Sequence, residues 1–127
     1  MSEPTAAPSR RLVVKSTAGV AAPELTNQAF TVAATALAAG VDVSVWLTGD
    51  SAWLGVPGRA ADLVLEHAAG LDDLLASLVE GAAVTVCTQC AARRGITQDD
   101  VIPGVRIAGA AVFVEEIMAS QTQALVY

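Results

Sequence analysis

Aromatic residues, cysteine and histidine are all scarce in this sequence. Although 54% of its 127 residues are hydrophobic, only two are Trp, two Phe and one Tyr, with two Cys and one His. A core must therefore be built mainly from closely packed Ala, Val and Leu. A structural zinc site usually takes four Cys or His ligands, so no zinc site within one chain is expected.

Positive charge is also scarce. Seven Lys and Arg against thirteen Asp and Glu give a net charge of −6, which is the wrong sign for general binding to phosphate backbones. We therefore expect no direct contact with nucleic acid. The sequence contains neither GxxxxGK[ST] nor GxGxxG, the patterns that cradle nucleotide phosphates, so no cofactor is expected either.

Long apolar runs are absent as well. None approaches the ~18 residues of a membrane-spanning helix, so no span is predicted. Residues 1–10 are rich in Pro, Ser and Ala without the apolar core of an export signal, which predicts a flexible tail. Residues 11–127 have the length of one ordinary domain. The expected location is the cytoplasm, where thiols stay reduced.

Strand-like and helix-like segments alternate along this domain. Apolar residues at helical spacing predict helices that begin at Pro23, Leu71 and Ala110, the last running to Ser120. Val114, Ile117 and Met118 are expected to face inward from that last helix. Short apolar or alternating runs predict strands at 11–16, 41–47, 83–87, 104–109 and 123–127. This alternation predicts an α/β fold with a mostly parallel sheet of about five strands, covered on both faces.

Three loops, 16–22, 48–53 and 87–91, directly follow the first three predicted strands. In parallel sheets, ligands and chemistry gather at the carboxyl ends of the strands, so we expect these loops to meet there. Asp50 and Trp53 of the second loop are candidate pocket residues. The single histidine, His67, lies in another segment and is expected at the surface or in an interface.

Both cysteines lie at the third of these strand ends. If the strand stops at Cys87, its thiol lies beside the N–H groups that open the next helix, with Arg93 and Arg94 following. A helix N-terminus and nearby arginine favour thiolate over thiol. Cys90 can reach back across one helical turn to resolve an oxidised or persulfidated Cys87. Alternatively, both cysteines are buried, closely packed and inert.

The stretch VTVCTQCAARRGI, residues 84–96, resembles the cysteine segment of the DsrE/DsrF-like family, which includes the sulfur-relay subunits of the DsrEFH and TusD-like type. The stretch AFTVAATALAAGVDVSVWLTGDSAWL is similar to the family's helix of small residues, second strand and following turn. LLASLVEGAAVTVC is similar to the helix that leads into the cysteine strand. The resemblance implies a three-layer α/β/α sandwich and a homo-oligomer, often a trimer or hexamer.

The resemblance also implies roles for the two cysteines. Cys87 falls on the persulfide-bearing position of the relay subunits, and Cys90 matches a second cysteine found in many members. The leading hypothesis is a cytoplasmic sulfur-handling protein, in which Cys87 carries sulfane sulfur between donor and acceptor proteins. Cys90 would assist release, and Arg93 or Arg94 would stabilise the thiolate.

The second hypothesis belongs to another class of function. It is a non-enzymatic oligomeric module that binds a small ligand or a partner, with the CxxC pair structural or acting as a thiol redox switch. Low aromatic content and an apolar surface favour assembly under either hypothesis. The two hypotheses differ in whether the protein is an enzyme.

Overall fold

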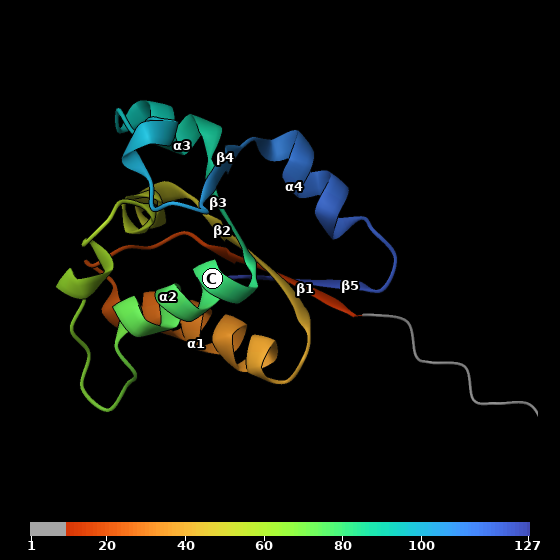
Figure 1. The fold of residues 1–127 in the computed structure, drawn as a ribbon, viewed down its shortest axis with the longest axis horizontal. Coiled ribbons are helices and arrows are strands. Elements are labelled where there is room, and N and C mark those ends of the chain that lie inside the picture. The colour runs from red at the N-terminus through yellow and green to blue at the C-terminus, as the bar shows by residue number, and fades with distance from the viewer. Residues whose placement is uncertain (1–9) are drawn as a thin grey trace, which may run out of the picture.

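The chain folds into one parallel sheet with helices on both sides, as Figure 1 shows. The structure is a computed structural model that describes residues 10–127. The tail predicted for residues 1–10 therefore lies outside the described residues, apart from Arg10, which directly precedes the first strand.

The sheet is parallel throughout, with neighbouring strands in the order β4-β3-β2-β1-β5. The predicted α/β fold with a parallel sheet of about five strands is confirmed. Short runs rich in β-branched residues suit strands that are buried in the middle of such a sheet. The strands are β1 (Arg11–Ser16), β2 (Asp42–Leu47), β3 (Ala83–Cys87), β4 (Arg106–Ala108) and β5 (Thr122–Val126).

The helices that connect the strands begin close to where the apolar spacing predicts. Pro23 occupies the first turn of α1, where its missing N–H removes no hydrogen bond. Within residues 10–127 the helices are α1 (Pro23–Ala38), α2 (Leu71–Gly81), α3 (Thr88–Arg93) and α4 (Ala110–Ile117), with 3₁₀ segments η1 (Gly49–Gly55), η2 (Ala60–Asp62) and η3 (Gln98–Asp100).

The main core lies between the sheet and the pair α1 and α2. Val14, Val45 and Val84 are in register across β1, β2 and β3, and all three are buried. They belong to one apolar cluster with Phe30 of α1 and Leu78 of α2. Burying each such side chain contributes about 1.5 to 3 kcal/mol, so this cluster fixes the strands whose ends form the site.

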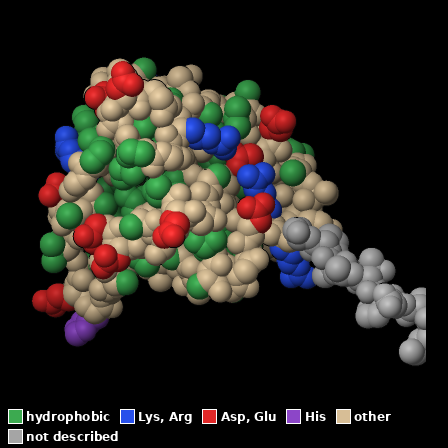
Figure 2. Space-filling view, viewed as in Figure 1, with side chains coloured by type: hydrophobic (Ala, Val, Ile, Leu, Met, Phe, Trp, Pro, Cys, Tyr) green, Lys and Arg blue, Asp and Glu red, His purple; other side chains and the backbone are tan. Residues whose placement is uncertain are grey.

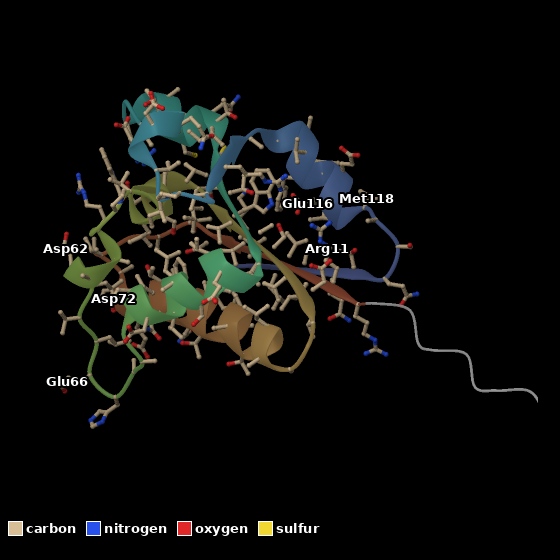
Figure 3. All side chains as sticks on the ribbon, viewed as in Figure 1. Arg11, Asp62, Glu66, Asp72, Glu116 and Met118 are labelled. Carbon is tan, nitrogen blue, oxygen red and sulfur yellow. The ribbon has the colours of Figure 1, made fainter. Side chains whose placement is uncertain are left out.

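The opposite face of the sheet is polar beneath α4. Glu116 of α4 is only 8% exposed and accepts hydrogen bonds from Ser44 Oγ at 2.5 Å and Trp46 Nε1 at 3.0 Å. Its carboxylate also pairs with Arg11 at 3.1 Å and Arg106 at 2.9 Å. Figure 3 shows Glu116 and Arg11 lying between α4 and the strands. This network satisfies a carboxylate that would otherwise be costly to bury.

The orientation predicted for the last helix is wrong. Val114 and Met118 are 51% and 76% exposed, and Ile117 is only half-buried. Glu116 faces the sheet instead, because the strands beneath it present hydroxyl, indole N–H and guanidinium donors that a carboxylate satisfies. The helix also ends at Ile117, short of the predicted Ser120.

Candidate functional site

Cys87 is the last residue of β3 and lies at the carboxyl edge of the sheet. The helix α3 begins at the next residue, Thr88, and Cys87 is paired in register with Ala108 at the end of β4. Its side chain is half-buried, and both Cys87 and Cys90 are free thiols. The strand, the turn and the start of the helix together give Cys87 partial access to solvent while fixing its backbone.

The surroundings of Cys87 favour its thiolate. Burial raises the pKa of the Cys87 thiol, but hydrogen bonds from the backbone N–H groups of Cys90 and Gln89 lower it. A hydrogen bond from the Cys90 side chain and the positive charge of Lys15 lower the pKa further, and the net shift is downward. The thiolate is the nucleophilic form of cysteine, so these contacts increase the fraction able to react at neutral pH.

Cys90 is held in place by the loop that follows β2. Its side chain is 8% exposed, and its Sγ accepts a hydrogen bond from the backbone N–H of Gly49 at 3.1 Å. Gly49 has a φ of +54°, and a Cβ there would lie 2.7 Å from the carbonyl oxygen of Thr17. Only glycine fits this turn without strain, and its backbone N–H is thereby held against the Cys90 sulfur.

The three predicted loops do meet at this edge. Ser16 Oγ and Ser51 Oγ are 2.6 Å apart, and Ser51 Oγ also donates to the carbonyl of Ala18. These bonds join the loops after β1 and β2, and the contact between Gly49 and Cys90 joins the loop after β2 to α3. The expectation that these three loops meet at the carboxyl edge of the sheet is therefore confirmed.

The two arginines of the cysteine segment differ in their surroundings. Arg94 is half-buried, and its Nη2 pairs with Asp50 Oδ1 at 2.8 Å while its Nη1 donates to the Cys90 carbonyl at 3.1 Å. Arg93 is exposed. In residues 10–127 neither arginine makes an ion pair or hydrogen bond with Cys87. Arg94 thus links the second loop to the helix that carries Cys90.

Trp53 and Asp50 line a small cavity of about 220 Å³ beside the first two loops. The guanidinium of Arg59 lies 4.6 Å from the centroid of the Trp53 ring, which is a cation–π geometry. The cavity is also lined by Gly19 and Asp62. Asp50 and Trp53, the candidate pocket residues, therefore line the same cavity.

His67 is placed away from the cysteine segment. It is exposed in the loop before α2, with a positive φ of 58°. Figure 2 shows it projecting at the lower edge of the molecule, whereas Figure 1 shows α3 at the top of the same view. This exposure agrees with the expected position at the surface or in an interface.

Two contributors to the thiol site were not predicted from the sequence. Lys15 is the penultimate residue of a β-branched strand, and Gly49 lies within the TGDS turn. A lysine inside an otherwise apolar strand and a glycine directly after a strand are both visible signals. Their relation to the cysteines depends on strand order, which the sequence pattern does not reveal.

Neither a metal site nor a membrane-spanning helix is found in residues 10–127. Across residues 10–127 no three His, Cys, Asp or Glu side chains come together in a way that could hold a metal ion. No helix in the same range is long and apolar enough to cross a membrane.

The fold and this edge define a class of protein, a parallel α/β chain with two neighbouring thiols at the carboxyl end of a central strand. The profile of the DsrE/DsrF-like family matches residues 11–123, and the chain belongs to this family. The family is associated with sulfur relay in general. The resemblance seen in the cysteine segment is therefore confirmed.

Individual relatives share part of the sequence or the fold of this chain. The uncharacterized protein MK0008 of Methanopyrus kandleri is 36% identical over 76 residues, and the match spans 60% of this chain and 60% of that protein. The crystal structure of the YchN protein from E. coli has a TM-score of 0.76 at 19% identity, covering 94% of this chain and 100% of that one. Protein MTH1491 from Methanobacterium thermoautotrophicum has a TM-score of 0.66 at 11% identity, with coverage of 94% and 100%. At these identities the two structures show the shared fold alone.

Proposed function

We propose that this protein carries sulfane sulfur as a persulfide on Cys87, as a sulfurtransferase or sulfur-relay subunit. The observation that supports this most directly is a half-buried thiol at the carboxyl edge of the sheet whose pKa is lowered. Burial raises the pKa of the Cys87 thiol. The backbone N–H groups of Cys90 and Gln89, with the Cys90 side chain and the charge of Lys15, lower it by more. Sulfur transfer needs an accessible thiolate, which this arrangement supplies.

Cys90 is assigned the resolving role in this proposal. It is one helical turn from Cys87, and its thiol donates to the Cys87 sulfur. Attack of the Cys90 thiolate on the inner sulfur of a Cys87 persulfide would form a disulfide and release hydrosulfide, so atoms and electrons balance. Arg94 acts as a positioning residue, because it holds the Cys90 carbonyl and Asp50 at the same time.

The decisive experiment is mass spectrometry after incubation with a low-molecular-weight persulfide. We expect the mass of one sulfur atom to be added to Cys87 in Cys90→Ser, to be added in the wild type until Cys90 resolves the persulfide, and to be absent from Cys87→Ser. Cys90→Ser is the matched control, because it removes a thiol three residues away and keeps Cys87. Equal labelling of wild type and Cys87→Ser would overturn the proposal.

Partners, location and assembly belong to the same proposal. A sulfur carrier needs donor and acceptor proteins, and a reduced thiol pair suits the cytoplasm. We further propose a homo-oligomer, either a trimer or a hexamer, which sedimentation analysis of the purified protein would test. Exposed apolar side chains on and directly after α4 and on β5, among them Val114, Met118 and Val126, support assembly.

A second candidate function is favoured by an apolar groove between α2 and the residues that follow η1. The groove has a volume of about 510 Å³ and is lined by Val56, Leu75, Val79 and Ile102 among others. Figure 2 shows hydrophobic side chains gathered in a hollow on this face of the molecule. A non-enzymatic module could bind a small apolar ligand there, with the CxxC pair structural or acting as a redox switch.

Thiol titration of the native protein separates the two functions. Rapid labelling of Cys87 at neutral pH supports the sulfur carrier, and equally slow labelling of both cysteines supports the binding module. Alkylation under defined glutathione ratios tests the redox switch, because that version requires a Cys87–Cys90 disulfide of measurable potential.

A further inference from the structure

Lys15 lies on the same face of the sheet as Cys87. Lys15 of β1 is in register with Trp46 of β2, which is in register with Thr85 of β3. Because side chains alternate along a strand, Cys87, two residues beyond Thr85, shares this face. Adjacent strands are about 4.8 Å apart, so the β1 and β3 backbones are separated by about 10 Å here. An extended lysine side chain can therefore act on Cys87 through its field, without contact.

In addition, no ion pair within residues 10–127 neutralises the charge of Lys15. Arg11 and Arg106 both pair with Glu116, whereas Lys15 has no carboxylate partner among residues 10–127. Its Nζ lies 5.1 Å from the centroid of the Phe113 ring of α4. A cation–π contact holds the ammonium in place without cancelling its charge. Because Lys15 is half-buried, solvent ions screen it less than they screen an exposed lysine.

We propose that Lys15 is a positioning residue of the Cys87 site, whose ammonium stabilises negative charge on the Cys87 sulfur and favours anionic sulfur donors over neutral ones. This inference rests on the function proposed above and adds a substrate class to it, small persulfides with a net negative charge. Charge on the donor and on the product persulfide would both be stabilised by the same ammonium.

The sulfur transfer itself needs no external oxidant. The Cys87 thiolate attacks the outer sulfur of a donor R–S–SH, so that a new S–S bond forms as the donor's own S–S bond breaks. The donor leaves as R–S⁻ with the bonding electron pair, and Cys87 becomes Cys–S–SH. The proton on the product persulfide can then be lost to solvent, and the resulting anion lies in the field of Lys15.

Alkylation measures this field without any sulfur donor. Iodoacetate and iodoacetamide both react with the thiolate, but only iodoacetate carries a negative charge. The ratio of their rates therefore cancels the thiolate fraction and reports the local potential at Cys87. All variants are made in a Cys90→Ser background, so that only Cys87 is alkylated.

We expect Lys15→Gln to lower the iodoacetate-to-iodoacetamide ratio by about three- to tenfold at low salt, the effect of removing one nearby charge in a partly screened site. Lys15→Arg should keep the ratio. The matched control is Arg10→Gln, which removes one charge from an exposed residue just before the start of the same strand. If Lys15→Gln and Arg10→Gln give the same ratio, the inference is wrong. Lys15→Met retains the aliphatic stem over Phe113 and provides the same reading if Lys15→Gln does not fold.

Sulfur uptake then tests the substrate class. The R group of glutathione persulfide carries a net negative charge and that of 2-hydroxyethyl persulfide carries none, so Lys15→Gln should slow uptake from the first more than from the second. Equal slowing would overturn the preference for anionic donors. The two proposals can be told apart: a ratio that depends on Lys15 without any sulfur on Cys87 removes the carrier function and its donor preference but leaves the electrostatic role of Lys15. Sulfur on Cys87 with an unchanged ratio removes the role of Lys15 only.

Discussion

The backbone N–H of Gly49 donates a hydrogen bond to Cys90 Sγ at 3.1 Å, across 41 positions of sequence. Cys90 in turn donates to Cys87, so an amide of the second loop is connected to the thiol at the end of β3. Hydrogen bonds in series polarise one another, which strengthens the donor that Cys90 presents to a thiolate. We therefore expect the reactivity of Cys87 to depend on a glycine in a different loop.

Gly49→Ala should destabilise the protein and expose Cys90. The substitution forces a Cβ to within 2.7 Å of the Thr17 carbonyl at a positive φ, which we expect to cost roughly 1 to 3 kcal/mol. Gly58→Ala is the matched control, because Gly58 also has a positive φ of 84° but nothing within 4 Å of its Cβ position. Urea denaturation and Cys90 labelling should both change more in Gly49→Ala. The same loss and the same labelling in both variants would contradict this.

Cys90→Ala should shift the pH profile of Cys87 alkylation to higher pH. The hydrogen bond from the Cys90 side chain is one of the contacts that lower the pKa of Cys87 against the effect of burial. Removing that donor takes away part of the lowering, whereas Cys90→Ser keeps a hydroxyl donor and should shift the profile less. The rate of iodoacetamide labelling measured against pH gives the midpoint. A midpoint in Cys90→Ala equal to that of the wild type would show that Cys90 does not stabilise the thiolate.

The stability of the folded protein should also depend on the Cys87 thiolate. The pKa of Cys87 is lowered in the fold, so its thiolate stabilises the fold above the pKa of an unfolded thiol. That contribution is lost as pH falls through the folded pKa. The difference in unfolding free energy between wild type and Cys87→Ser, measured in urea under reducing conditions, should therefore grow with pH between these two values. A difference independent of pH would show that the pKa is the same in both states.

Local patterns were sufficient to predict where the two cysteines lie in the fold, whereas their interactions with distant residues could not be predicted. The run that ends at Cys87 and the helical residues after it are contiguous, so the strand end and the position of Cys90 follow from the sequence alone. The Gly49 amide and the Lys15 charge reach the thiols only through the order of the strands. Neither interaction can be recognised from the spacing of residues near the cysteines.

The orientation of α4 is a second feature that local spacing does not predict. Apolar spacing predicts that Val114 and Met118 face inward, but the sheet face beneath α4 offers polar donors from β1, β2 and β4. A pattern based on hydrophobicity alone assigns Glu116 to solvent. The strands that satisfy its carboxylate lie at least ten residues away in the chain, so only the folded arrangement shows that this residue is the one that docks the helix.

Glu116→Ala should therefore destabilise the protein by roughly 2 to 4 kcal/mol, because it leaves the Trp46 indole N–H and the Ser44 hydroxyl without their buried acceptor. Glu116→Gln should lose less, since its amide oxygen can still accept one of these bonds although its charge no longer balances Arg11 and Arg106. The matched control is Glu115→Gln, an exposed neighbour on the same helix whose replacement should change stability by less than about 0.5 kcal/mol. Urea denaturation gives all three values. If Glu116→Ala and Glu115→Gln unfold at the same denaturant concentration, the buried carboxylate does not hold α4 on the sheet.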